Sequence, residues 1–508
     1  MAILTLLEVT GIQSYIFGSN QLAQHIGASE LVRQVSDDWV HEMAPEAVVY
    51  AGGGNALLIF NTREEAERFA RELSKRALMR ARGLQLVIKH RSFDPKSDSL
   101  AEVHQKLREE MAKRKRDRIF STPLSSVGVT ATCVYTGKPA VGEDIEGRFI
   151  STEVQHKLVA EKPGRKRLQE LLPQVARRGY DFVYDFNDLG TPGESSYLAI
   201  IHTDGNRMGQ RIKAIGEQYA RPEQNEQYQQ ALKDFSDSVR EAANHALRVT
   251  VDALLDAVVV EQTPEGEKRS IGDIPLRRRG KNGPWLLPFR PIVFGGDDVT
   301  FVSEGRLGLS VAAKYLQVFS SQILSDGEPA YCRAGIAVVK THYPFSRAYE
   351  LAEALCASAK RFIVEEANSE GRLTALDWHF AVGGLVLPLE QIRQREYKVP
   401  FGNLLMRPVR LNPPDGDWRS WKTFTTILEG FMQNPWAEKR NKIKALRKAL
   451  REGPEATKHF LALYNLSLPE VPGEPDLTVS GWHGSGRCGY WDAIEALDFY
   501  VPLEGEVQ

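Results

Sequence analysis

The stretch Pro291-Ile-Val-Phe-Gly-Gly-Asp-Asp-Val-Thr-Phe-Val302 decides how this chain is interpreted. Two short apolar runs flank two glycines and two aspartates, which predicts a β-hairpin with Gly295 and Gly296 in its turn. The adjacent carboxylates of Asp297 and Asp298 repel each other unless a proton or a cation lies between them. Taken alone, the pattern fits an ordinary surface hairpin and a metal-binding turn equally well.

A second stretch upstream favours the metal-binding interpretation. An apolar strand that begins at Tyr197 ends in Asp204, and a helix is expected to begin near Asn206. If this strand and the hairpin are buried neighbours, Asp204 lies beside the two aspartates of the turn. Carboxylate oxygens suit Mg²⁺, and free N–H groups at a helix start suit phosphate. The alternative is that Asp204 only caps the helix.

Four segments carry a resemblance to a known family. They are Gly295-Gly-Asp-Asp298, Thr203-Asp-Gly-Asn-Arg-Met-Gly209, Arg333-Ala-Gly-Ile-Ala-Val-Val339 and Tyr343-Pro-Phe-Ser-Arg-Ala-Tyr-Glu-Leu-Ala-Glu-Ala-Leu-Cys-Ala-Ser-Ala-Lys360. Together they resemble the second palm domain of the large polymerase-cyclase subunit of type III CRISPR effectors. More remotely they resemble the GGDEF-type diguanylate cyclases. The resemblance is strongest from Leu198 to Lys360.

The resemblance implies a Mg²⁺- or Mn²⁺-dependent nucleotidyltransferase that converts ATP into cyclic oligoadenylate, a second messenger in antiviral defence. It implies that Asp204, Asp297 and Asp298 are both the catalytic residues and the metal ligands. The expected nucleotide-binding residues are Gly205, Asn206, Arg207, Met208, Gly295, Gly296 and Lys360. For Lys360, a phosphate contact and an ordinary exposed lysine are equally open.

Two other functions stay open. The first is a diguanylate-cyclase-like enzyme that makes a cyclic dinucleotide. The second is a catalytically silent scaffold subunit that binds RNA or nucleotide. A scaffold has little use for a repelling cluster of carboxylates, which favours an enzyme. The expected partners are ATP and, beyond it, RNA or other CRISPR or defence subunits; a homodimer is also open.

The N-terminal region repeats the pattern without its charges. Residues 1–98 predict the element order βαββαβ, the split arrangement of a ferredoxin-like palm. The turn Gly52-Gly-Gly-Asn55 falls where Gly295-Gly-Asp-Asp298 falls, and Thr10 stands at the position of Asp204. This copy should therefore bind no metal tightly. Its glycine turn either forms a wall of the nucleotide pocket or is purely structural.

The expected fold class is α+β, with two ferredoxin-like palm or cyclase domains in pseudo-symmetric pairing and two further regions. The chain has 508 residues, enough for three or four domains. We expect a degenerate palm at 1–98, a helical and mixed inter-palm domain at 99–190, a catalytic palm at 191–385 and a helical C-terminal domain at 386–508. The segment 262–285 is expected to be a loop whose Arg277 to Arg279 could reach phosphate, and 484–489 a connector.

Composition limits the partners and the compartment. The formal net charge is −1, so any RNA-binding surface must be local, as at 113–118, 165–167 and 177–178. Four scattered cysteines without a C-x-x-C pair predict no zinc site and a cytoplasmic, reducing location. No signal peptide or membrane span is expected. The chain starts in a palm and lacks a His-Asp dipeptide, so we expect the family's N-terminal nuclease domain to be missing.

Overall fold

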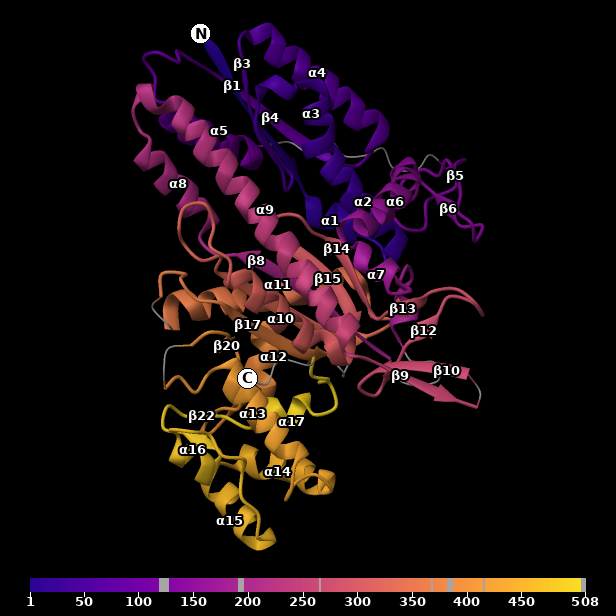
Figure 1. The fold of residues 1–508 in the computed structure, drawn as a ribbon, viewed down its shortest axis with the longest axis vertical. Coiled ribbons are helices and arrows are strands. Elements are labelled where there is room, and N and C mark those ends of the chain that lie inside the picture. The colour runs from indigo at the N-terminus through magenta and orange to yellow at the C-terminus, as the bar shows by residue number, and fades with distance from the viewer. Residues whose placement is uncertain are drawn as a thin grey trace.

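The structure is a computed structural model in which residues 1–117, 128–190, 196–264, 266–366, 369–381, 387–413 and 416–503 are described. Figure 1 shows three parts along the long axis: an N-terminal sheet with its helices, a central sheet with its helices, and a C-terminal group of helices. The domain boundaries expected at 190/191 and 385/386 involve residues outside this description, as does Arg118 of the first basic cluster.

The N-terminal part has the strand order expected of a split βαββαβ unit. Its antiparallel sheet runs β2-β3-β1-β4. The elements are β1 (Ala2–Thr10), α1 (Ile12–Phe17), α2 (Leu22–Arg33), α3 (Trp39–Met43), β2 (Val48–Gly52), β3 (Asn55–Phe60), α4 (Arg63–Arg80) and β4 (Gln85–Phe93). Helix α4 begins with a capping box in which Thr62 accepts from the Glu65 N–H and Glu65 accepts from the Thr62 N–H.

The central part repeats this order in a six-stranded sheet, β14-β15-β8-β16-β17-β20, whose first four strands follow the N-terminal pattern. The elements are β8 (Tyr197–Gly205), α8 (Met208–Gln218), α9 (Asn225–Asp256), β14 (Phe289–Val293), β15 (Val299–Glu304), α10 (Gly308–Ser320), β16 (Cys332–Lys340), α11 (Phe345–Arg361), β17 (Ala375–Ala381) and β20 (Val409–Arg410). Helix α9 contacts β2 of the first sheet and α10 of the second, so it joins the two parts (Figure 1).

Between the two sheets in the sequence come α5 (Leu100–Arg116), β5 (Gly142–Glu143), β6 (Phe149–Ile150), α6 (Thr152–Leu171), α7 (Pro173–Arg177) and β7 (Tyr180–Phe182). Several basic residues of this region make internal contacts. Arg165 lies over the Tyr184 ring and pairs with Glu161, and Arg178 pairs with Asp256. These two clusters therefore offer less free charge to RNA than the sequence suggested.

The prediction of a loop at 262–285 is wrong. This segment contains the hairpin β9 (Val258–Thr263) and β10 (Gly266–Ile271), followed by β11 (Ile274–Pro275), β12 (Arg277–Arg278) and β13 (Trp285–Leu287). Polar and charged residues dominate the sequence from 261 to 279, and β9 is largely exposed, so the composition resembled that of a loop. The arginines bind the inter-palm region: Arg279 pairs with Asp181, and Arg277 donates to the Gly190 carbonyl at 2.5 Å. They do not extend toward the Gly-Gly-Asp-Asp turn.

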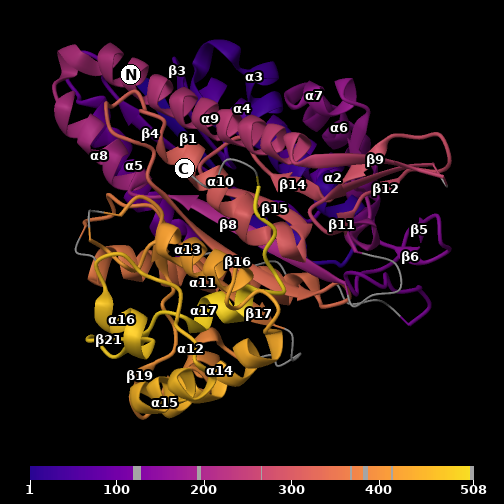
Figure 2. The same cartoon turned by 60° about the horizontal axis from the view of Figure 1, so that its bottom comes forward.

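The C-terminal part is mainly helical, with a small sheet β18-β19-β22-β21. Its elements are α12 (Leu389–Glu396), β18 (Lys398–Val399), β19 (Gly402–Asn403), α13 (Trp421–Met432), α14 (Arg440–Glu452), α15 (Pro454–Tyr464), α16 (Pro475–Ser480), β21 (Trp482–His483), β22 (Arg487–Cys488) and α17 (Trp491–Ala496). The glycine-rich stretch 484–489, expected as a connector, forms part of the hairpin β21–β22. Figure 2 shows these helices gathered below the central sheet.

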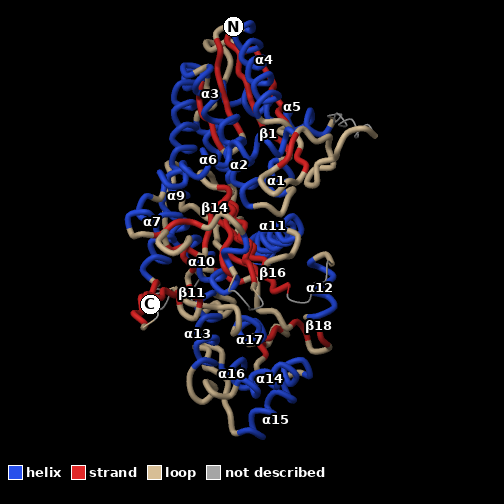
Figure 3. Tube along the Cα trace, turned by 90° about the vertical axis from the view of Figure 1, so that its right-hand side faces the viewer, coloured by secondary structure: helices blue, strands red, loops and turns tan. Residues whose placement is uncertain are grey.

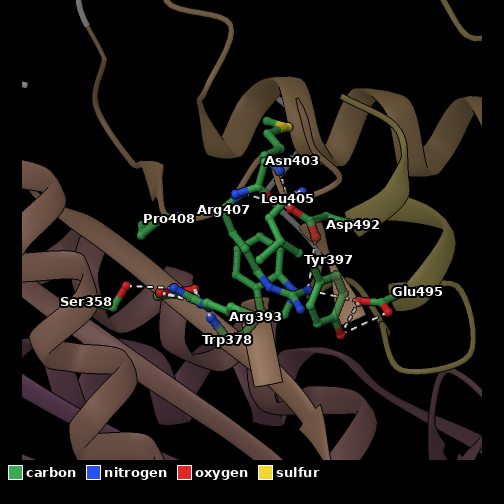
Figure 4. Close-up of polar contacts among 12 residues, drawn as sticks. Ser358, Trp378, Arg393, Tyr397, Asn403, Leu405, Arg407, Pro408, Asp492 and Glu495 are labelled. Atoms are coloured by element: carbon green, nitrogen blue, oxygen red, sulfur yellow. Dashed lines mark hydrogen bonds and ion pairs between the residues drawn. The ribbon is translucent and has the colours of Figure 1, made fainter. Parts of the chain in front are cut away.

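Buried ion pairs join the C-terminal part to the central sheet (Figure 4). Arg407 is fully buried and contacts Asp492 at 3.0 Å and Glu495 at 3.2 Å, both in or beside α17. Asp377 of β17 accepts two hydrogen bonds from Arg393 of α12, at 2.6 and 2.7 Å. Near its end the chain returns to the central part, where the Val501 N–H bonds the Arg306 carbonyl at 2.9 Å (Figure 3). No helix in the described ranges has the length and apolar character of a bilayer-spanning segment.

Candidate functional site

Three carboxylates meet where β8 and the β14–β15 turn end. Strand β15 pairs antiparallel with β8, with Val299 opposite Thr203. One step further along this register, Asp298 stands beside Asp204. Asp297 comes next to Gly205, and a Cβ placed on Gly205 would lie 2.9 Å from the Asp297 Cβ. A side chain at position 205 would therefore push Asp297 away, so the close approach of Asp297 explains why residue 205 is a glycine.

The cluster is electrostatically crowded. Removal from bulk water and the charge of Asp204 raise the pKa of Asp297 to about 7. The same two causes, with Glu353 of α11 added, raise the pKa of Asp298 to about 7. The side chains of Asp204 and Asp298 remain 33% and 51% exposed, so water and small cations reach them. Crowded carboxylates in contact with solvent fit a divalent cation.

His202 is a site residue to which the sequence assigned no role. Its Nδ1 lies 3.4 Å from Asp298 Oδ1 and 3.4 Å from the Tyr349 hydroxyl of α11. Burial lowers the pKa of His202 below its usual value, so the imidazole is neutral at pH 7. A neutral imidazole can donate one hydrogen bond and orient the Asp298 carboxylate. The available signal was its position two residues before Asp204, on the same face of the strand.

Arg333 of β16 stands directly opposite Asp204 and pairs with its carboxylate. The same guanidinium donates to Asn206 Oδ1 at 2.6 Å and to the Gly205 carbonyl at 3.2 Å. In the part of the chain that the structure describes, no three His, Cys, Asp or Glu side chains are arranged to hold an ion as they stand.

A cavity between the two palm-like sheets reaches the turn. Gly295, Gly296 and Asp297 line one side of it, and the glycine turn of the first sheet, 52–55, lines another. Met208 at the start of α8 and Arg240 of α9 also line this inter-palm cavity. Arg240 donates to the Ala51 carbonyl at 3.0 Å, beside the first glycine turn. The two glycine turns that the sequence aligned therefore face a common space.

Arg167 of α6 supports the turn from behind. Its guanidinium lies over the Phe294 ring and donates to the Phe294 carbonyl at 3.0 Å, immediately before Gly295. Gly295 has φ of +96°, a conformation that favours glycine. The sequence placed Arg167 in a candidate RNA-binding cluster, whereas the structure uses it to position the turn.

Two of the expected nucleotide-binding residues have other partners. The Asn206 N–H bonds the Tyr331 carbonyl at 2.8 Å and its side-chain amide bonds the Leu373 carbonyl at 2.7 Å, so Asn206 is a buried structural residue. Arg207 has φ of +63° and pairs with Glu328 at 3.0 Å. Helix α8 therefore starts at Met208, two residues later than expected, because Asn206 is tied to the neighbouring segments.

The remaining expected residues keep positions compatible with nucleotide binding. Gly205 lies beside Asp297, and Met208, Gly295 and Gly296 line the inter-palm cavity. Lys360 is exposed on α11, seven residues after Glu353 and therefore on nearly the same helix face. Sequence reasoning alone did not identify Arg240, Arg333 or Glu353, because their relation to the turn depends on strand pairing and helix packing.

The fold and this turn define a palm-type protein with a Gly-Gly-Asp-Asp turn. Residues 197–367 match the family described as Cas10/Cmr2, second palm domain. No curated protein matches the sequence.

Solved structures of Csm1–Csm4 cassettes share the fold over 98% of this chain. An apo cassette matches at 14% identity with a TM-score of 0.56, and the match covers 70% of the cassette chain. A cassette in complex with cA4 matches at 13% identity with a TM-score of 0.53. A cassette in complex with AMPPNP matches at 14% identity with a TM-score of 0.52. Each match covers 69% of the cassette chain. These likenesses show that the chain shares the fold of the Csm1–Csm4 cassette structures.

Proposed function

We propose that this chain is a Mg²⁺-dependent nucleotidyl cyclase that joins ATP into cyclic oligoadenylate. The observation that carries the proposal is the meeting of Asp204, Asp297 and Asp298 at neighbouring strand ends, where Asp297 lines the inter-palm cavity. A type III palm domain and a shared fold with cassettes that bind cA4 and AMPPNP support adenine nucleotides as the substrate class. In each step the 3′ hydroxyl of one nucleotide would attack the α-phosphate of the next ATP and release pyrophosphate. The ring would close when the last 3′ hydroxyl attacks the α-phosphate at the 5′ end and releases the final pyrophosphate.

The residues present fit a divalent cation. Desolvation and the neighbouring carboxylates both raise the pKa of Asp297 and of Asp298, and a bound cation would relieve the repulsion among the carboxylates. The groups that would hold Mg²⁺ or Mn²⁺ are Asp297, Asp298 and the second carboxylate oxygen of Asp204, the one other than the oxygen paired with Arg333. When bound, such an ion neutralises phosphate charge and lowers the pKa of an attacking hydroxyl.

The chain's own residues would orient the nucleotide. Gly296 leaves room for phosphate against the turn, since nothing lies within 4 Å of a Cβ placed there. Arg240, on the opposite wall of the cavity, offers a fork of donors that suits phosphate. His202 would hold Asp298, and Arg167 would hold the turn. Lys360 remains a proposed phosphate contact at the rim.

The test is incubation of the purified full chain with each NTP and Mg²⁺, with and without RNA, and separation of the products by mass. We expect cyclic oligoadenylate from ATP. Replacing Asp297→Ala together with Asp298→Ala should lower turnover by at least 100-fold, because electrostatic stabilisation of this kind contributes about 10²–10³ in rate. Turnover that survives the double substitution contradicts the mechanism. A cyclic dinucleotide made from GTP would instead identify a diguanylate-cyclase-like enzyme.

One observation favours a second candidate, the silent scaffold. Arg333 already pairs with Asp204, as expected of a site that binds nucleotide without turning it over. Binding of ATP or RNA without any product, unchanged after loss of the carboxylates, would support that function. The related cassettes pair Csm1 with Csm4, and we infer that a comparable subunit assembles with this chain. Native mass spectrometry of the chain, purified together with the proteins that bind it, tests this inference.

A further inference from the structure

The first palm-like sheet has an outer edge along β4. In the strand order β2-β3-β1-β4, the nine residues of β4 pair with β1 on one side and with no other strand among the residues that the structure describes. Alternate N–H and C=O groups of such a strand point outward, away from the sheet. An edge of this kind is a place where another strand can add.

A groove, here called the β4 groove, runs along this edge. Helices α4 and α5 contact β4 from its two faces (Figure 1). Five consecutive residues of β4, 86–90, line the groove together with residues of both helices. Its volume of about 1040 Å³ is at the upper limit for small-molecule pockets, roughly 300–1,000 Å³. Five residues of strand span roughly 16 Å, so the shape fits an extended segment of chain.

The wall of the β4 groove on the α4 side is largely apolar. Leu86 and Ile88 pack on the core cluster that contains the buried face of α4, whereas Val87 packs on the cluster that contains the buried face of α5. Leu78 is 61% exposed and continues the apolar surface one helical turn beyond Ser74. A strand laid along β4 would therefore meet apolar groups with one set of its alternate side chains.

The wall on the α5 side is basic. Lys113 and Arg114 line it, and Arg71 of α4 stands across the groove; all three are exposed and form no ion pair with a described residue. The lining also contains two carboxylates, Glu110 and Asp117, but Glu110 already pairs with two cations beside it. The groove therefore has an excess of positive charge that acidic side chains would neutralise.

The same charge could attract RNA, but the described lining favours a polypeptide. It contains no Phe, Tyr or Trp on which a base could stack, and its carboxylates repel phosphate. It offers instead a strand edge, which bonds to the backbone N–H and C=O groups of another chain. A second copy of this chain fits less well, because pairing of two β4 edges would bring the same basic walls together.

We propose that the β4 groove binds an extended acidic segment of another protein, which adds to the sheet as a fifth strand beside β4. In this segment apolar residues alternate with Asp or Glu. The apolar side chains face α4, and the acidic ones face Lys113 and Arg114. The groove lies on the first palm, so the proposal does not depend on nucleotide turnover.

The test uses the full chain and a fluorescent peptide of about ten residues, the length of a long strand, in which Glu and Val alternate. We expect binding, measured by anisotropy, and slower hydrogen–deuterium exchange in residues 85–93, because new backbone bonds protect the edge amides. N-methylation of one alternate set of peptide amides should weaken binding at least about 10-fold, because each methyl group removes a donor. Methylation of the other set, which faces away from β4, should leave binding unchanged.

Charge reversal tests the basic wall. Lys113→Glu together with Arg114→Glu should weaken peptide binding at least about 10-fold, and both residues are exposed, so the variant should fold. Lys444→Glu together with Lys448→Glu makes the same charge change at two exposed lysines of α14 and is the matched control. It should bind the peptide like the wild type.

Several outcomes overturn the proposal. They are no binding at about 1 mM peptide, binding without protection of residues 85–93, equal effects of the two methylated sets, and tighter binding of a peptide in which Lys and Val alternate. Single-stranded RNA that protects 85–93, and is released by the charge reversal, would assign the groove to RNA instead. A dimer in sedimentation that protects the same residues would assign it to a second copy of the chain.

Discussion

At Asp297 a proton and the proposed divalent cation would compete for one carboxylate. The pKa of about 7 in the folded chain lies above the ordinary aspartate value of 3.8, so the folded form holds the proton more tightly than the unfolded form. The resulting stabilisation is present in full below about pH 4 and is lost as the pH rises through 7. We predict that Asp297→Asn raises the free energy of unfolding by about 1–2 kcal/mol at pH 8 without metal.

Urea unfolding at pH 5 and pH 8 checks this prediction. The difference between Asp297→Asn and the wild type should shrink at pH 5, and Mg²⁺ should stabilise only the wild type at pH 8. Asp234→Asn, at an exposed aspartate of α9, is the control and should follow the wild type at both pH values. Equal stability of Asp297→Asn and wild type at pH 8 would mean that the carboxylates are not crowded.

At the scale of elements, the packing of α11 on β16 places Tyr349 and Glu353 beside the turn. Gly335 is the point of closest approach: a Cβ there would lie 2.0 Å from the Ala352 carbonyl oxygen and 2.3 Å from the Cys356 nitrogen. Both atoms are helix backbone and cannot rotate away. We predict that Gly335→Ala costs about 1–3 kcal/mol of stability, as overpacking does. It should also lower any nucleotide turnover, because α11 carries the partner of His202.

The midpoint of urea denaturation and the turnover rate measure the two effects. Gly296→Ala is the matched control for folding, since it adds the same methyl group where nothing lies within 4 Å. That variant should unfold like the wild type. A wild-type midpoint for Gly335→Ala would show that α11 does not lie as close to the sheet as described.

For the whole molecule, the joint between the central sheet and the C-terminal part depends on buried charge. Arg407 and Asp492 are both fully buried (Figure 4). Replacing Asp492→Ala leaves the arginine buried without its main counter-charge, which typically costs about 3–5 kcal/mol. We predict loss of cooperative unfolding or a strongly lowered melting temperature, measured by calorimetry. Asp498→Ala breaks an exposed pair with Arg440 in the same region and should change stability by less than about 1 kcal/mol.

A melting temperature for Asp492→Ala within a degree of the wild type would mean that Glu495 alone compensates Arg407. In that case the double substitution of both acids should produce the loss. Either result shows which acidic residues stabilise the contact between the C-terminal helices and the sheet that carries the Gly-Gly-Asp-Asp turn.

Local pattern was enough for much of this protein. Apolar strands ending in Asp204 and in the turn before Asp297 predicted the meeting of these residues, and the repeated glycine turn predicted two sheets of the same strand order. The prediction from local pattern failed at the hairpin of residues 258–271, where exposed strands have the composition of a loop.

The sequence by itself determined the strand ends, the Gly-Gly-Asp-Asp turn and its family, because each is written in consecutive residues. Only the tertiary structure decided that Arg333 pairs with Asp204, that His202 contacts Asp298, and that Arg167 supports the turn. The physical reason is distance along the chain. Arg333 and Asp204 are 129 positions apart in the sequence, and such a contact depends on strand register and packing, which no local pattern encodes.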